Sequence, residues 1–136
     1  MPRAVVLALA LALGTATYAA DAYTPAVNFQ LQCMGCHHAD GAGEPGRVPS
    51  LRRTLVAFAM LPEGREFVIR VPGVAQSTLS DAETAELLNW MARHLSDAAP
   101  PEGFANFTAE EVARSRHHPL PAVAAARADL MRRVVP

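Results

Sequence analysis

The sequence predicts an all-α protein built as one domain. Its 136 residues fall in the size range of about 100–200 residues that one domain occupies. A Ser or Thr followed three residues later by Glu occurs at 80–83 and at 108–111, a pattern that caps helix N-termini. Apolar residues recur at helical spacing in 84–95 and in 123–134. These observations together favour helices over strands.

Composition excludes several classes of protein. Twelve basic residues, all of them Arg, face 13 acidic ones, so the formal net charge is -1. The chain therefore lacks the basic excess that is typical of nucleic-acid-binding proteins. Apolar residues make up 51% of the chain, which with the low net charge argues against a long disordered protein. Two Cys, three positions apart, cannot form a framework of several disulfides.

Residues 1–20 have the pattern of a cleaved signal peptide. Arg3 supplies the positive charge, and 4–13 is an unbroken apolar run followed by small residues. About ten apolar residues are too few for an uncleaved membrane anchor, because a transmembrane helix needs about 20. We expect a periplasmic protein whose mature chain does not span the membrane.

The first helix is expected directly after this segment. Thr24 can cap it, and Pro25 takes the first helical position, which tolerates proline. This helix runs into Cys33-Met34-Gly35-Cys36-His37. The stretch 39–49 contains three Gly and two Pro, so we expect a loop there.

The middle of the chain gives an ambiguous pattern. Residues 51–61 indicate no definite element. In 63–71, the run Phe67-Val68-Ile69 favours a strand, whereas the lead-in Pro62-Glu63-Gly64 favours a helix. Pro72-Gly73 ends this element.

The next predicted helix covers 80–96 and starts with the capping box of Ser80 and Glu83. One face of this helix is formed by Thr84, Leu87, Leu88, Met91 and Leu95.

Residues 98–136 form a linker and a helical tail. Pro100-Pro101 marks the linker, a short helix is predicted over 108–117, and a last helix over 122–134. The last helix has one apolar side, which carries Val123, Ala126, Leu130 and Val134. Because such a side is unfavourable in water, we expect both tail helices to fold back on the preceding residues.

The pattern C-x-x-C-H at 33–37 is the attachment signature of c-type haem. Two thiols three positions apart can form thioethers with the two vinyl groups of one porphyrin, and His37 then lies under the iron. We therefore predict one haem c attached through Cys33 and Cys36. The haem would complete a core that about 70 residues alone would leave marginal.

Three competing interpretations of the motif are weaker. A disulfide oxidoreductase would need a βαβ context, which this sequence lacks. A zinc site would need two further ligands, and adjacent Cys36 and His37 are poorly placed to bind one tetrahedral metal. A structural disulfide between Cys33 and Cys36 leaves His37 without a role.

With these residues, 24–96 resembles the class I monohaem cytochromes c. Phe29 lies four residues before Cys33, Pro49 lies twelve after His37, and Trp90 lies in the predicted helix 80–96. The resemblance implies a cytochrome c-like haem domain over 21–97 with a C-terminal helical extension, 98–136. It also implies that Trp90 packs across the first helix, and that the Pro49 carbonyl accepts a hydrogen bond from the second ring nitrogen of His37, which orients the ligand.

The resemblance implies a Met ligand on the distal side of the iron, shortly before the helix 80–96. Residues 71–78 contain neither Met nor His. We select Met60 as the distal candidate, because it is the thioether nearest to this position along the chain that lies outside a helix face and outside the motif. The alternatives are Met91, Met34, His117, His118 and an open sixth site, in which Gln76 is the one planar amide.

Five arginines lie in the segments that flank the haem in this family. They are Arg47, Arg52, Arg53, Arg65 and Arg70. They are either solvated surface residues, ligands of the haem propionates, or a docking patch, since the Arg fork matches a carboxylate. His38 and His94 are expected at the surface.

The resemblance implies an electron carrier and not an enzyme. Its partners would be redox proteins such as a periplasmic dehydrogenase or a terminal oxidase. Two alternatives remain: a haem protein whose open sixth site binds a small gas or peroxide, and a haem subunit docked to a larger dehydrogenase or oxidase.

Overall fold

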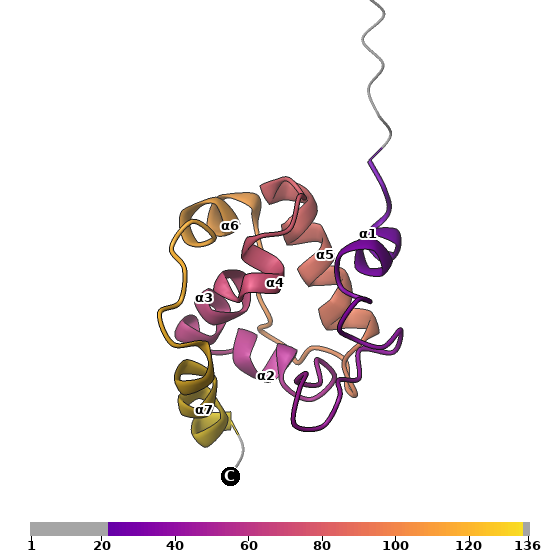
Figure 1. The fold of residues 1–136 in the computed structure, drawn as a ribbon. Helices are drawn as coiled ribbons and strands as arrows, with labels where there is room; N and C mark the ends of the chain where they lie inside the picture. Colours follow the sequence, from indigo (N-terminus) through magenta and orange to yellow (C-terminus); the bar gives the residue numbers. More distant parts are fainter. Residues whose placement is uncertain (1–21, 135–136) are drawn as a thin grey trace, which may run out of the picture.

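The computed structural model describes residues 22–134, and these residues form seven α-helices. The predicted all-α class is confirmed (Figure 1). The predicted signal peptide, 1–20, lies outside the described residues. The helices are α1 (Pro25–Gln32), α2 (Leu55–Ala59), α3 (Pro62–Arg70), α4 (Pro72–Ala75), α5 (Asp81–His94), α6 (Ala109–Ser115) and α7 (Val123–Val134).

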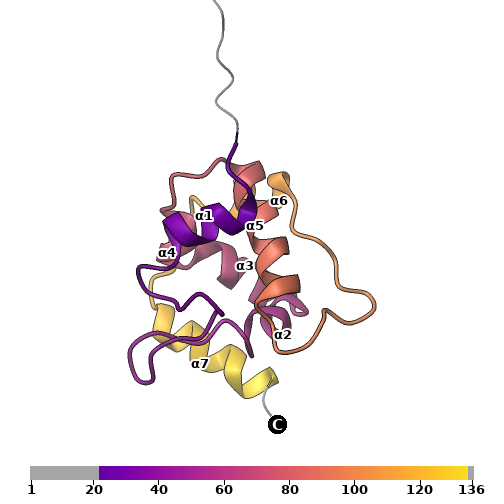
Figure 2. The same cartoon turned by 90° about the vertical axis from the view of Figure 1, so that its right-hand side faces the viewer.

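Helices α1 and α5 lie against each other (Figures 1 and 2). The Oγ1 atom of Thr24 accepts the N–H of Val27 and so caps α1. The ring of Phe29 is almost fully buried and lies 5.8 Å from the Trp90 ring, centroid to centroid. The aromatic contact that the resemblance implied is therefore present.

Residues 63–70 of the segment whose sequence favoured neither strand nor helix lie in helix α3. Pro62 occupies the first helical turn of α3, Glu63 lies near the positive N-terminal end, and Arg70 near the negative C-terminal end. Gly64 lets α3 pack closely on α2, because a Cβ atom there would lie only 2.0 Å from the Phe58 carbonyl oxygen. Helix packing thus outweighs the strand preference of Phe67-Val68-Ile69. The single-turn helix α4, which follows α3 directly, was not predicted.

Helix α5 begins with the predicted capping box. The Ser80 hydroxyl accepts the Glu83 N–H at 3.2 Å, and the Glu83 carboxylate accepts the Ser80 N–H at 2.9 Å.

Helices α6 and α7 pack on the earlier helices. Helix α6 contacts α3 and α5, whereas α7 contacts α2 and α3. The Thr108 hydroxyl accepts the Glu111 N–H, as predicted for a cap. The Glu111 carboxylate, however, accepts two hydrogen bonds of 2.7 Å from the Arg65 guanidinium, so it fastens α6 to α3 instead.

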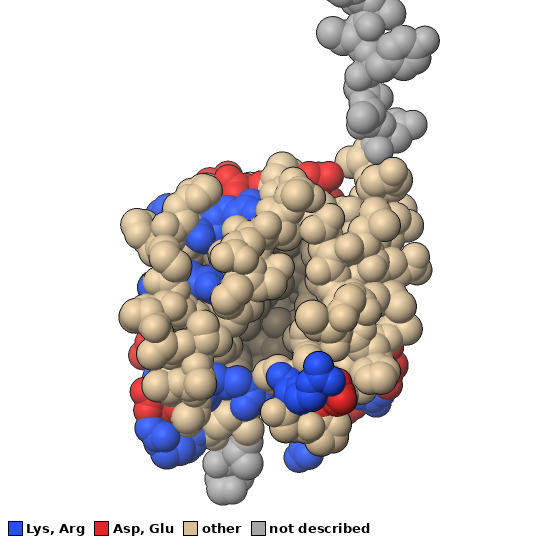
Figure 3. Space-filling view, in the orientation of Figure 1, with Lys and Arg blue, Asp and Glu red and all other residues tan. Residues whose placement is uncertain are grey.

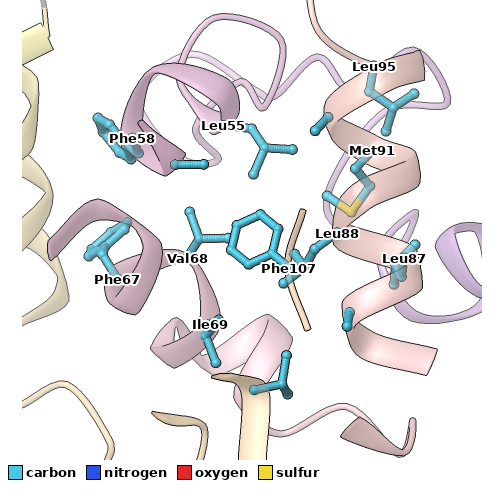
Figure 4. Close-up of a cluster of buried hydrophobic side chains, with 14 of the residues drawn as sticks. Leu55, Phe58, Phe67, Val68, Ile69, Leu87, Leu88, Met91, Leu95 and Phe107 are labelled. Atoms are coloured by element: carbon cyan, nitrogen blue, oxygen red, sulfur yellow. The ribbon is translucent and has the colours of Figure 1, made fainter. Parts of the chain in front are cut away.

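The hydrophobic core lies between α2, α3 and α5 (Figure 4). The tail shares this core, because Phe107, Val112 and Leu130 are also buried in it. No helix within residues 22–134 combines the length and apolar character that a membrane crossing requires.

Candidate haem-binding site

The motif at 33–37 forms a tight turn at the end of α1. The Cys33 N–H donates to the Phe29 carbonyl at 2.9 Å. The Cys33 carbonyl then accepts the N–H groups of Cys36 at 3.1 Å and of His37 at 2.9 Å. These hydrogen bonds present both thiols and the imidazole to one side of the turn, where all three line the same cavity.

This cavity has a volume of about 390 Å³, within the range of about 300–1,000 Å³ that cofactor sites occupy. It opens as the central hollow of the face shown in Figure 3. Six core residues line it: Leu55, Phe58, Phe67, Val68, Leu88 and Met91. The cavity therefore reaches into the hydrophobic core. In Figure 4, Met91 points from α5 into the middle of this cluster.

Helices α3 and α4 form one wall with the segment that joins them. Their lining residues are Phe67, Val68, Val71, Gly73 and Val74. All the side chains of this wall are hydrocarbon, so it suits the apolar body of a porphyrin.

Burial lowers the pKa of the His37 imidazole. The ring is thereby favoured in its neutral form, which is the form that binds a metal. The Nδ1 atom is buried and has no hydrogen-bond partner in the described part of the chain. The hydrogen bond from this atom to the Pro49 carbonyl, which the resemblance implied, is not formed in the structure, although both residues line the cavity.

Pro49 is positioned by a close contact with Gly43. A Cβ atom at residue 43 would lie 2.0 Å from the Val48 carbonyl oxygen and 2.6 Å from that of Pro49. Only glycine fits there, so the loop 39–49 folds back on itself and brings Val48 and Pro49 to the cavity.

Arg52 anchors the other end of this loop. Its guanidinium donates to Asp40 and to Asp97, each at 2.7 Å. The N–H of Ala42 and the Arg52 guanidinium lower the pKa of the Asp40 carboxyl. Asp40 is therefore favoured in its ionised form, in which it accepts the Ala42 N–H and the Arg52 guanidinium and holds the loop.

The two cysteines differ in environment. Burial, followed by the proximity of Cys36, raises the pKa of the Cys33 thiol to about 11, whereas Cys36 is exposed. The thiols are not bridged. Within the described residues, no cluster of three or more His, Cys, Asp or Glu could hold a zinc ion.

The structure does not bring Met60 to this cavity. Met60 follows α2 with 42% of its surface exposed, and it is not among the lining residues. Met34, Gln76, His117 and His118 do not line the cavity either, and His38 and His94 are exposed as expected. Of the sulfur and imidazole candidates for the distal position, the lining contains Met91 alone.

Among the described residues that line the cavity there are two arginines and no carboxylate. Of the five arginines considered from the sequence, only Arg47 lines it. Arg65 binds a carbonyl oxygen and the Glu111 carboxylate of the tail, whereas Arg70 binds the His118 carbonyl and pairs with Glu66 on its own helix. The second lining arginine is Arg127 of α7, which the sequence reasoning missed. The sequence pattern that could have identified it is an arginine four residues after Val123, on the otherwise apolar side of the last helix.

Two thiols, one imidazole and apolar core side chains around one cavity have the form of a haem-binding site, and the donor set fits a c-type haem. No protein-family model matches the chain. A protein named cytochrome c-552 from Thermus thermophilus is 35% identical over 128 residues, which cover 81% of this chain and 78% of that protein. A second cytochrome c-552, also from Thermus thermophilus, is 36% identical over 103 residues, or 62% of this chain and 79% of that protein.

The chain belongs to the c-type cytochromes, because this identity extends over more than two thirds of the first relative. It is an electron-carrying haem protein rather than an enzyme, and its family implies a covalently bound haem c and redox partners.

Proposed function

We propose that this protein is an exported, periplasmic carrier of single electrons with one haem c, attached by thioethers to Cys33 and Cys36. The observation that supports this most strongly is that both thiols and His37 line one cavity that cuts into the hydrophobic core. The bound haem iron would accept and release one electron. The protein's own residues would attach the haem and orient it.

His37 is the proposed proximal ligand. Its neutral imidazole can bind the iron through one nitrogen. In the loaded protein, we propose that the buried Nδ1 donates to the Pro49 carbonyl, which would strengthen the ligand and fix its ring. The contact between Gly43 and Pro49 holds the acceptor in place.

The open mouth of the cavity supports electron exchange with partner proteins. A carrier needs one haem edge near its surface, and the hollow in Figure 3 opens directly to solvent. We propose a periplasmic dehydrogenase or terminal oxidase as the partner.

The test is expression of the full chain in a bacterium with the c-type maturation system. We expect haem that stays on the polypeptide in a denaturing gel, one haem per chain by mass, and a periplasmic product cleaved near residue 20. The C33S/C36S variant should carry no covalent haem, whereas Met34→Leu, which changes an exposed residue within the motif, should carry it normally. Haem-free wild-type protein, or haem released on denaturation, would overturn the proposal.

A second candidate function is supported by the apolar wall of α3 and α4. This wall supplies no iron ligand, and Met60 lies outside the cavity, which favours a haem whose sixth position accepts a small gas or peroxide. The test adds carbon monoxide to the reduced protein. Stoichiometric binding, with a high-spin spectrum before addition, would support it, and a six-coordinate low-spin spectrum that Met91→Leu abolishes would refute it.

A further inference from the structure

We propose that Arg127 binds a carboxylate group of the haem, so that helix α7 of the tail is part of the cofactor site. This inference rests on the proposed function, because it needs a haem in the cavity. It assigns to the tail a role in holding the cofactor and in setting its reduction potential.

Helix α7 lies at the edge of the cavity and contributes lining residues to it. Val123 and Arg127 are one helical turn apart, and both line the cavity. The same helix contacts α2 and α3, while Leu130 is buried in the core. The tail therefore forms part of the cavity wall, more than 80 residues after the motif.

The positive charge of Arg127 is not paired by another described residue. Its side chain is half-buried, and no residue within 22–134 gives its guanidinium an ion pair or a hydrogen bond. Its neighbours on α7 differ, since Arg132 pairs with Asp129 and Arg133 lies 3.3 Å from the Glu63 carboxylate. A partly desolvated cation without a counter-charge is unfavourable, so this side of the cavity suits an anion.

The chemistry of the anion follows from the cavity lining. Within residues 22–134, no Asp or Glu lines the cavity, whereas Arg47 and Arg127 both do. A haem is apolar apart from its two carboxylates, and the forked guanidinium of arginine binds a carboxylate through two parallel hydrogen bonds.

Arg47 can serve the second carboxylate. It lies on the loop 39–49 and pairs with Glu44 at 3.0 Å, with 77% of its side chain exposed. Such exposed pairs are weak and exchange easily, so the pair does not keep Arg47 from another anion.

Two consequences follow for Arg127. A hydrogen bond between Arg127 and the haem anchors α7, so its loss should let the tail open more often. A cation near the iron also favours the ferrous form, because that form carries one positive charge fewer than the ferric form. Replacing Arg127 with a neutral residue should therefore lower the reduction potential.

The experiment compares Arg127→Met and Arg127→Lys with Arg132→Met in the haem-loaded full chain. Arg132 is the matched control, because it lies on the same helix, pairs with Asp129 and does not line the cavity. The readouts are the reduction potential and the rate at which a protease cleaves between α6 and α7.

In Arg127→Met we expect a lower potential and cleavage faster by about tenfold, which corresponds to about 1.4 kcal/mol. Arg127→Lys should restore most of the potential, because it keeps the charge, and Arg132→Met should match the wild type in both readouts.

An unchanged potential in Arg127→Met would overturn the proposal even if cleavage accelerates, because Arg127 would then act only within the tail. Equal shifts in Arg132→Met would overturn it as well. If Arg127→Met fails to mature, Arg127→Gln decides, because it also removes the charge: a lowered potential supports the proposal, and a wild-type potential overturns it. A wild-type protein without covalent haem is a separate outcome, since it refutes the proposed function itself.

Discussion

Replacing Arg116 with Met should destabilise the protein and disturb the cavity. Arg116 is the C-cap residue directly after α6, and only 8% of its side chain is exposed. Its guanidinium donates hydrogen bonds of 2.9 Å to the carbonyls of Leu79 and Ser77 and to the Asp81 carboxylate. These acceptors lie in the segment between α4 and α5 and in the first turn of α5, next to the wall that Val74 contributes to the cavity.

The expected loss in the free energy of unfolding follows from the ion pair and the hydrogen bonds that the substitution removes. Breaking a buried ion pair costs about 3–5 kcal/mol, and a hydrogen bond to a charged group contributes about 1.5–3 kcal/mol. Asp81 is partly exposed and can be hydrated in the variant, which lowers the cost. We therefore expect a loss of about 3 kcal/mol in the free energy of unfolding. For a chain of this size, that lowers Tm by about 10 °C.

The assay is thermal unfolding of the haem-loaded protein, followed by circular dichroism and by the visible haem spectrum. Arg114→Met is the control, because Arg114 lies on the same helix, is exposed and forms no ion pair within the described residues. That change should stay within about 0.5 kcal/mol of the wild type. If the two variants unfold at the same temperature, the argument that Arg116 fastens α6 to the cavity wall is wrong.

Three further predictions concern the site. Gly43→Ala should displace Pro49, because the new Cβ atom would overlap its carbonyl, and should reduce the yield of holoprotein at least severalfold; a normal yield would refute the close contact. Met60→Ala should leave the visible and near-infrared spectra unchanged, because Met60 is exposed outside the cavity; loss of the sulfur-to-iron band of the oxidised protein would instead establish it as the distal ligand. The double change Cys33→Ser and Cys36→Ser should remove covalent haem and much of the helicity seen by circular dichroism, since the cavity lies inside the core; native helicity without haem would contradict this.

Local patterns predicted most of the elements correctly. Thr24-Pro25 and the box of Ser80 and Glu83 act over one helical turn, so neighbouring residues alone decide them. The segment around Phe67 was ambiguous for the opposite reason. Its preference depended on the packing of α3 against α2 through Gly64, which no local pattern records.

The candidate site divides in the same way. The spacing of Cys33, Cys36 and His37 is local, because the chemistry of one turn requires it, and the structure brings all three to one cavity. Met60 was chosen because it precedes the helix 80–96 in the sequence and lies outside a helix face. Position in the sequence does not determine whether a side chain after a helix points toward the cavity or away from it. The structure places this residue outside the lining.

The sequence by itself determined the all-α class, the helix caps, the haem-attachment motif and the apolar side of the last helix, because each depends on residues within a few turns of one another. Only the tertiary structure decided which residues from distant segments form the cavity. In the folded protein, Val123 and Arg127 of α7 line the same cavity as the motif. The Glu111 carboxylate binds Arg65 instead of completing a cap. The physical reason is that packing and charge pairing act through space, between residues whose separation along the chain carries no trace of their contact.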